Sequence, residues 1–254
     1  MIWRNLDNVY FIGIGGIGMS ALARFFRSQG KYVAGYDRVS SPLTDQLVRE
    51  DIDIHFVDQT ALIPAAFRDP DRTLVIYTPA VPESHQELHY FRQRGFRVIK
   101  RSAALGEVFN VGHGVAVAGT HGKTSVSTML AYLLSSSKAG CNAFLGGISK
   151  NFNSNLVVDP GTQNIIAEAD EFDRSFLALY PHLAVVTSMD PDHLDIYHSK
   201  DNLVKGFETF ISQIRDKGKL IIKKGLSPRV PETVEVFTYD IHDPEADYSI
   251  QAIE

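Results

Sequence analysis

Short apolar runs alternate with amphipathic stretches along the first hundred residues. Runs with the length and composition of buried strands are Val9–Ile12, Tyr32–Tyr36, Asp53–Val57, Leu74–Tyr77 and Phe96–Ile99. Helical spacing between them predicts helices over Met19–Gln29, Pro42–Glu50 and Ser84–Gly95. Such alternation is typical of an open parallel sheet covered by helices. We therefore expect an α/β, Rossmann-like domain over residues 1–105.

The alternation continues in the second half of the chain. Further strand-like runs are Val115–Ala118, Asn164–Ala167, Leu183–Thr187 and Val234–Tyr239. A short helix is expected just before the first of them, where the two halves would meet. We expect a second α/β domain over residues 106–254.

One loop of this second domain carries the clearest chemistry. The run Val115–Ala118 leads into Gly119-Thr120-His121-Gly122-Lys123-Thr124-Ser125, where helical spacing resumes. In a phosphate-binding loop the backbone N–H groups contact phosphate oxygens, the lysine reaches the β- and γ-phosphates, and the next hydroxyl ligates Mg²⁺. Only two residues separate Gly119 from Gly122, where the common pattern has four. The segment predicts a P-loop ATPase-type domain that binds ATP; the alternative is an ordinary glycine turn before a helix.

A second glycine-rich loop follows the first strand. Gly13-Ile14-Gly15-Gly16-Ile17-Gly18 matches the dinucleotide fingerprint, and Asp37 lies about 20 residues further on, at the end of the next strand. The fingerprint specifies a pyrophosphate on a helix N-terminus, which NAD and a UDP-sugar both offer. Asp37 is either a ribose ligand or a turn cap.

Two other strand ends face the same region in an open parallel sheet. Thr78–Pro82 follows the third long strand, so its residues should lie near the glycine loop. Lys100 and Arg101 follow the next strand and either meet a phosphate or remain solvated.

Carboxylates gather at the ends of two strands in the second domain. Glu168, Asp170, Glu171 and Asp173 follow one strand, and His193 lies among aspartates after the next. Clustered negative charge is costly unless a cation or water offsets it. With Thr124 at a third strand end, we predict a shared Mg²⁺ site of Thr124, Glu168 and His193. The alternatives are a solvated acidic helix start and a surface ion pair.

Composition limits the function classes. The 254 residues are 44% hydrophobic and 22% charged, with a net charge of −5. The sequence has no basic cluster that would indicate a nucleic-acid or membrane-surface partner. It also has no apolar run of the roughly 20 residues that a membrane span requires. A single cysteine, Cys141, suits a cytoplasmic protein.

Five motifs in order resemble those of the Mur ligases. They are Gly13-Ile-Gly-Gly-Ile-Gly-Met-Ser20, Ala118-Gly-Thr-His-Gly-Lys-Thr124, Leu145-Gly-Gly-Ile-Ser-Lys-Asn151, Glu168-Ala-Asp-Glu171 and Asp192-His-Leu-Asp195. The short phosphate loop is the form that this family uses. The resemblance implies that the first domain binds the UDP of a UDP-sugar, and not NAD. The residues it implies there are Gly15, Gly16, Ile17, Gly18, Asp37, Thr78, Pro79, Ala80 and Arg101.

The resemblance also implies an activity. It is ATP-dependent amide ligation in peptidoglycan precursor synthesis, in which UDP-N-acetylmuramate is activated as an acyl phosphate and L-alanine then displaces phosphate. Lys123, His121, Glu168 and His193 would be the catalytic residues, with ATP and Mg²⁺ on the phosphate loop.

Length is the main departure from the resemblance. Members of the family usually have a third domain that brings the amino acid, so we expect a truncated chain that binds UDP-N-acetylmuramate without completing ligation alone. Three other hypotheses stay open: a recycling ligase that attaches a ready-made peptide to the same UDP-sugar, a nicotinamide-dependent oxidoreductase, and a non-catalytic UDP-sugar-binding module.

Overall fold

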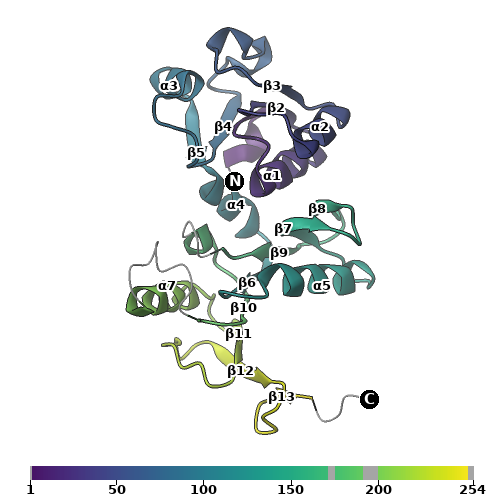
Figure 1. Cartoon of the computed structure of the whole chain (residues 1–254), viewed down its shortest axis with the longest axis vertical. Helices are drawn as coiled ribbons and strands as arrows, with labels where there is room; N and C mark the ends of the chain where they lie inside the picture. The colour runs from purple at the N-terminus through teal and green to yellow at the C-terminus, as the bar shows by residue number, and fades with distance from the viewer. Residues whose placement is uncertain (1, 171–174, 191–199, 251–254) are drawn as a thin grey trace. The chain divides into compact units, whose positions relative to one another are not determined.

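The computed structural model describes residues 2–170, 175–190 and 200–250. The chain divides into two compact units, Met1–Glu107 with Gly147–Val158, and Val108–Gly146 with Asp159–Glu254 (Figure 1). Each unit contains helices and parallel strands, so the predicted mixed α/β fold with parallel sheets is confirmed. The described residues include no helix long and apolar enough to cross a membrane.

The sheet of the first unit has five parallel strands in the order β3-β2-β1-β4-β5. The strands are β1 (Asn8–Ile12), β2 (Tyr32–Tyr36), β3 (Asp53–His55), β4 (Thr73–Tyr77) and β5 (Arg97–Lys100). The helices are α1 (Ile17–Ser28), α2 (Pro42–Arg49), α3 (Gln86–Gln93) and α4 (Arg101–Phe109), with 3-10 turns η1 (Ile2–Asn5), η2 (Thr60–Leu62) and η3 (Ala65–Phe67). All five residues of β1 are buried, as expected for the central strand of a sheet covered on both faces.

Helix α1 begins at Ile17, two residues before the predicted Met19. The last part of the glycine-rich run is therefore the first turn of the helix. Gly16 is the N-cap residue, no side chain caps the helix, and no acidic residue lies in its first turn. The N–H groups at this end are left to other partners, as an anion site requires.

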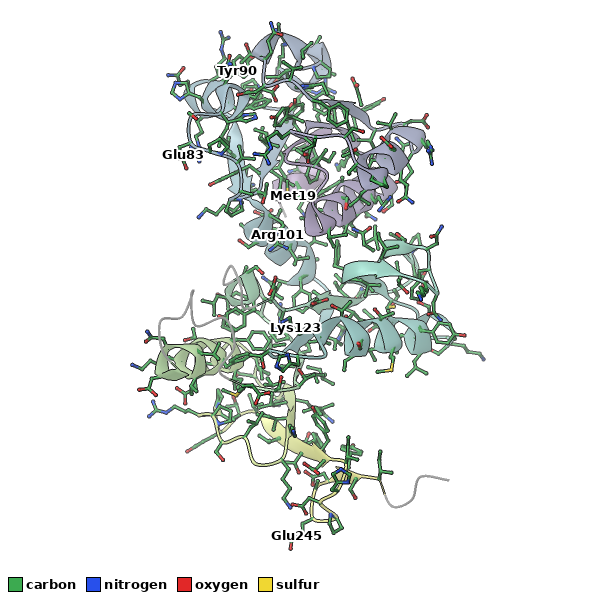
Figure 2. The ribbon with its side chains drawn as sticks, viewed as in Figure 1. Met19, Glu83, Tyr90, Arg101, Lys123 and Glu245 are labelled. Atoms are coloured by element: carbon green, nitrogen blue, oxygen red, sulfur yellow. The ribbon has the colours of Figure 1, made fainter. Side chains whose placement is uncertain are left out.

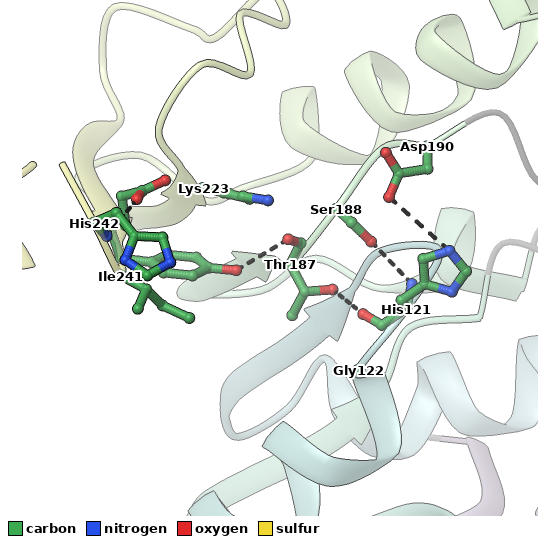
Figure 3. Close-up of a pocket in the computed structure, with 10 residues that line it drawn as sticks. His121, Gly122, Thr187, Ser188, Asp190, Lys223, Ile241 and His242 are labelled. Atoms are coloured by element: carbon green, nitrogen blue, oxygen red, sulfur yellow. Dashed lines mark hydrogen bonds and ion pairs between the residues drawn. The ribbon is translucent and has the colours of Figure 1, made fainter. Parts of the chain in front are cut away.

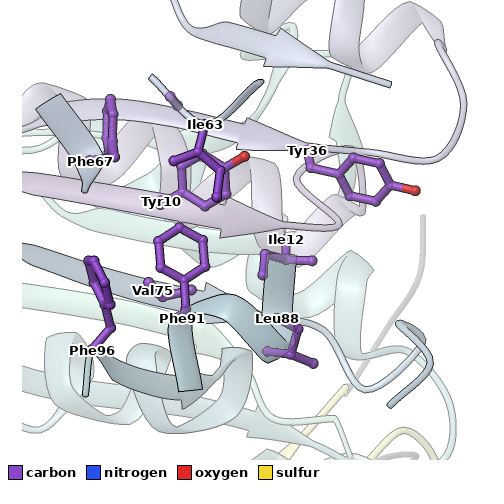
Figure 4. Close-up of a cluster of buried hydrophobic side chains, with 10 residues drawn as sticks. Tyr10, Ile12, Tyr36, Ile63, Phe67, Val75, Leu88, Phe91 and Phe96 are labelled. Carbon is purple, nitrogen blue, oxygen red and sulfur yellow. The ribbon is translucent and has the colours of Figure 1, made fainter. Parts of the chain in front are cut away.

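Aromatic side chains fill the core between the first sheet and α3 (Figure 4). Tyr10 lies 5.1 Å from Phe91 between ring centroids, and Phe91 lies 4.8 Å from Phe96 in an edge-to-face arrangement. Truncating a buried aromatic ring to alanine costs about 3–5 kcal/mol. This cluster is thus a large contribution to the stability of the first unit.

The second sheet is ordered β13-β12-β11-β10-β6-β9-β7-β8, and its strands belong to the second unit except for β8 and the last residues of β7, which lie in the segment Gly147–Val158 of the first unit. Its strands are β6 (His113–Ala118), β7 (Asn142–Ser149), β8 (Ser154–Val157), β9 (Asn164–Glu168), β10 (Leu183–Val186), β11 (Lys219–Lys223), β12 (Glu235–Asp240) and β13 (Tyr248–Ser249). The other elements are α5 (Lys123–Ser135), the 3-10 turn η4 (Ser175–Ala178) and α7 (Lys200–Ser212). Strand β6 pairs in parallel with β9 and β10, so the loops after these three strands emerge at one edge.

A polar network is buried inside the first unit. The Tyr10 hydroxyl donates to Glu87 Oε2 at 2.8 Å and lies 2.8 Å from His55 Nε2, which is 3.2 Å from Glu87 Oε1. The Glu87 side chain is fully buried. Burial raises the pKa of Glu87 to about 7 and lowers the pKa of His55, so the interior favours the neutral form of both groups.

The pKa of Glu87 predicts a pH-dependent stability. Since its folded pKa lies above the unfolded value, the wild type should lose stability as the pH rises from 5 to 8. Glu87→Gln removes this titration and keeps His55, so the Tm of the variant relative to the wild type should rise over the same range. Thermal unfolding at several pH values measures the difference, and parallel Tm curves for the two proteins would contradict the prediction.

Candidate functional site

The glycine-rich loop of the first unit lies at the carboxyl end of β1. Gly13 adopts φ +85°, and its N–H donates to the Tyr36 carbonyl at 2.8 Å. The next turn is fixed by Asp37, which accepts the Gly15 N–H at 2.6 Å. Asp37 is therefore part of the loop's own framework, and its second oxygen accepts a long hydrogen bond of 3.4 Å from the Val39 N–H.

Two other predicted residues contact this loop. A Cβ on Gly13 would lie 2.4 Å from Thr78 Cγ2, and a Cβ on Gly18 would lie 2.6 Å from Arg101 Nη1. Arg101 begins α4 (Figure 2), so its guanidinium lies beside the first turn of α1. Pro79 and Ala80, which follow Thr78, are exposed. The structure thus brings Asp37, Thr78 and Arg101 together around the glycine loop, a position that the strand ends predicted for Thr78 and left open for Arg101.

The phosphate-type loop of the second unit joins β6 to α5. Gly119 and Gly122 have φ of +131° and +81°, conformations that favour glycine. Gly122 is the N-cap of α5 and no side chain caps that helix, which leaves its first N–H groups to other partners. Lys123 Nζ donates to the Gly119 carbonyl at 2.8 Å, so the lysine lies over the loop.

Residues after β10 brace this loop (Figure 3). The Thr187 hydroxyl donates to the carbonyls of Ala118 and His121, and Ser188 Oγ accepts the His121 N–H at 2.9 Å. A Cβ on Gly119 would lie 2.0 Å from Thr187 Oγ1, so only glycine fits against this brace. The His121 side chain remains 62% exposed, with Nε2 3.9 Å from an Asp190 oxygen.

Thr124 and Glu168 form the core of the predicted metal site. The Thr124 hydroxyl lies 2.9 and 3.0 Å from the two Glu168 oxygens, and the Gly146 N–H donates to Glu168 Oε2 at 2.9 Å. Burial raises the pKa of Glu168, and the bonds from Thr124 and Gly146 and the charge of Lys123 oppose that shift. A partly buried carboxylate that is costly to ionise suits a nearby cation.

Oxygen donors of this kind fit Mg²⁺, which prefers carboxylate and hydroxyl ligands. No group of three or more His, Cys, Asp or Glu side chains gathers as a metal cluster within residues 2–170, 175–190 and 200–250. The third predicted ligand, His193, and the acidic residues Glu171 and Asp173 lie outside those described residues. The fit therefore rests on the pair Thr124 and Glu168.

A cavity of about 470 Å³ adjoins the phosphate-type loop (Figure 3). Its walls include His121 and Gly122 from the loop, and Lys223, Tyr239 and His242 from the ends of β11 and β12. The Tyr239 hydroxyl donates to the Thr187 carbonyl at 3.0 Å, which connects the cavity wall to the brace. The sequence analysis did not select Lys223, Tyr239 or His242, although each lies at or just after the carboxyl end of a parallel strand.

Comparison with known sequences identifies the family. The model of the Mur ligase family catalytic domain matches residues 8–113, and that of the Mur ligase middle domain matches residues 117–254, more than half of the chain. The chain belongs to the Mur ligase family. The two matched regions contain the two glycine loops of this Mur ligase, one in each.

Curated relatives are similar over nearly all of this Mur ligase chain. It is 52% identical over 245 residues to UDP-N-acetylmuramate–L-alanine ligase of Porphyromonas gingivalis, covering 96% of this chain and 54% of the relative. It is 56% identical over 235 residues to the protein of the same name from Parabacteroides distasonis, covering 92% and 51%. The chain spans about half the length of these relatives.

Solved Mur ligase structures share the fold. UDP-N-acetylmuramate-alanine ligase of Thermotoga maritima matches with a TM-score of 0.80 and 25% identity, over 96% of this chain and 54% of that one. UDP-N-acetylmuramate:L-alanyl-gamma-D-glutamyl-meso-diaminopimelate ligase of Neisseria meningitides matches with a TM-score of 0.81 at 22% identity, over 92% and 78%. At that identity the second likeness extends to the fold alone.

The burial of Glu168 predicts a stabilising substitution. Without added Mg²⁺, Glu168→Gln should raise Tm at pH 8, because the amide occupies the same space without an ionised group to desolvate. The gain should shrink as the pH falls, since the raised pKa lets the wild-type carboxyl take up a proton at a higher pH than an ordinary glutamate does.

Differential scanning calorimetry measures both effects. Asp190→Asn is the control, because it neutralises a carboxylate of the same unit whose side chain is 67% exposed, and its Tm should change little. A Tm loss for Glu168→Gln at pH 8 would contradict the prediction.

Proposed function

We propose that this chain forms the UDP-sugar- and ATP-binding part of a cytoplasmic ligase that joins L-alanine to UDP-N-acetylmuramate in peptidoglycan precursor synthesis. The observation that carries the proposal is the 52–56% identity to curated relatives named for that reaction. The two glycine loops, each at a helix N-terminus that lacks a side-chain cap, support it. The likeness to the peptide ligase of Neisseria meningitides extends to the fold only and adds no second candidate.

The first unit would bind UDP-N-acetylmuramate. The pyrophosphate would lie at the N-terminus of α1, on the backbone of Gly15, Gly16, Ile17 and Gly18, where the helix dipole favours negative charge. The guanidinium of Arg101 lies beside Gly18 and would supply a counter-charge. Asp37 would bind a ribose hydroxyl through its outer oxygen, and Thr78, Pro79 and Ala80 would shape the wall of the site.

The second unit would bind ATP. Gly119, Thr120, His121, Gly122, Lys123, Thr124 and Ser125 would surround its phosphates. The Lys123 ammonium would give up its hydrogen bond to the Gly119 carbonyl and stabilise charge on the γ-phosphoryl group during transfer. Thr124, Glu168 and His193 would hold Mg²⁺, which would supply positive charge to neutralise the phosphate oxygens during transfer.

The reaction would run in two steps. The lactyl carboxylate of UDP-N-acetylmuramate attacks the γ-phosphorus of ATP, so ADP leaves and an acyl phosphate forms. The amine of L-alanine then attacks the acyl carbon, inorganic phosphate leaves, and the amine loses a proton as the amide forms. The exposed His121 imidazole at the loop would approach the acyl phosphate or the muramoyl group.

Binding of the UDP-sugar tests the first half of the proposal. We expect calorimetric titration to detect UDP-N-acetylmuramate binding to the wild type, and Asp37→Ala to weaken it about ten-fold or more, since the loop loses the 2.6 Å bond to Gly15. Asp71→Ala is the matched control, because it removes the same charge from a turn at the opposite, amino end of β4. A wild type that binds NADH but no UDP-sugar would overturn this assignment in favour of the oxidoreductase.

Binding of ATP tests the second half. Lys123→Ala should weaken Mg²⁺-ATP binding by about ten-fold or more and leave UDP-N-acetylmuramate binding unchanged, because the two ligands are assigned to different units. Lys138→Ala, which removes an exposed lysine beyond α5, serves as the charge-matched control. Equal ATP affinity in both variants would exclude Gly119–Thr124 as the phosphate loop.

A further inference from the structure

Asn155 lies on β8, far along the sequence from the glycine-rich loop, and is fully buried. It belongs to the segment Gly147–Val158, which groups with the first unit. Within that unit β8 packs against α1. A buried amide must have hydrogen-bond partners, and those of Asn155 are all on α1.

The Asn155 amide bonds to the first turns of α1. Its Nδ2 donates to the Ile17 carbonyl at 2.6 Å and to Ser20 Oγ at 2.9 Å. Its Oδ1 accepts a hydrogen bond from Arg24 Nη1 at 2.6 Å. Both ends of the amide are thus fixed, so the side chain has one orientation.

Arg24 is itself held firmly. Its Nε donates to Glu50 Oε2 at 2.8 Å, and its Nη2 donates to Glu50 Oε1 at 2.9 Å. The arginine side chain is 11% exposed. Because a paired arginine at a largely buried site keeps its geometry, it fixes the Asn155 oxygen and hence the direction of the donating nitrogen.

We propose that Asn155 is a positioning residue for pyrophosphate binding at the N-terminus of α1. The inference rests on the function proposed above. The carbonyl of Ile17 and the N–H of Gly18 belong to one planar peptide group, so holding the oxygen sets the direction of the N–H. A carbonyl that accepts an additional hydrogen bond also polarises that peptide group, which makes the Gly18 N–H a stronger donor.

The position of Gly18 explains why this peptide group needs support from outside the helix. The Arg101 guanidinium lies against Gly18, in the space that a Cβ would fill. Because glycine has no Cβ, its backbone dihedral angles are less restricted than those of any other residue. Asn155 supplies the restraint that a Cβ would otherwise provide.

The test compares ligands that differ by one phosphate. We expect Asn155→Ala to raise the Kd for UDP about ten-fold and to change the Kd for UMP much less, so that the preference for UDP over UMP falls. The Kd for Mg²⁺-ATP should stay within about two-fold of wild type, since ATP is assigned to the second unit. A loss of stability alone would not change the ratio of UDP to UMP affinity.

A pair of serine variants provides a matched control on the same helix. Ser20 and Ser28 each donate to a carbonyl three residues earlier, at 2.9 and 2.7 Å, but only Ser20 also accepts from Asn155. Ser20→Ala should lower the preference for UDP by about two- to three-fold, and Ser28→Ala should leave it unchanged. If Asn155→Ala does not fold, this pair of variants tests the positioning role in its place.

The outcomes distinguish a failure of the proposed function from a failure of the positioning role. If the wild type binds neither UDP nor UDP-N-acetylmuramate, the proposed function fails. If the wild type binds both and the ratio of UDP to UMP affinity is the same in Asn155→Ala, or in Ser20→Ala and Ser28→Ala, the positioning role is overturned while the proposed function stands.

Discussion

An anion binds at a helix N-terminus through backbone N–H groups that no side chain caps. Each unit has a glycine at such an N-cap, Gly16 before α1 and Gly122 before α5. Two other glycines leave space for charged side chains beside these helices. Arg101 Nη1 lies 2.6 Å from the Cβ position of Gly18, and a Glu168 oxygen lies 2.1 Å from the Cβ position of Gly146.

The charges that fill these spaces have opposite signs. A guanidinium beside α1 can meet a pyrophosphate directly. The carboxylate of Glu168 beside α5 would repel a phosphate unless a cation lay between them, and burial raises its pKa. This difference in sign supports the proposal that Mg²⁺ binds in the second unit.

Sequence predicted the features that depend on strand order alone. Buried runs ending in Gly13, Asp37 and Thr78 had to meet at one edge of a parallel sheet, and the structure brings them together. The brace of Thr187 and Ser188 and the cavity wall at Tyr239 escaped prediction, because ordinary polar residues after a strand carry no spacing signal.

The side chain of Asn155 escaped prediction for a different reason. Its hydrogen-bond partners Ile17 and Ser20 lie more than 130 positions earlier in the chain. A single sequence contains no pattern that predicts such a long-range contact. The predicted division at residue 105 likewise placed residues 147–158 within the second domain, whereas Gly147–Val158 groups with the first unit.

That grouping has a consequence for the order in which the chain folds during synthesis. The first unit lacks part of its own packing until residue 158 has been made, and by then β6 and α5 of the second unit have already been translated. Contacts so distant in sequence form late, since the loop between them must close first. The N-terminal unit therefore cannot be completed from its first 107 residues alone, and it gains its last segment only after residues 108–146 of the second unit have been synthesised.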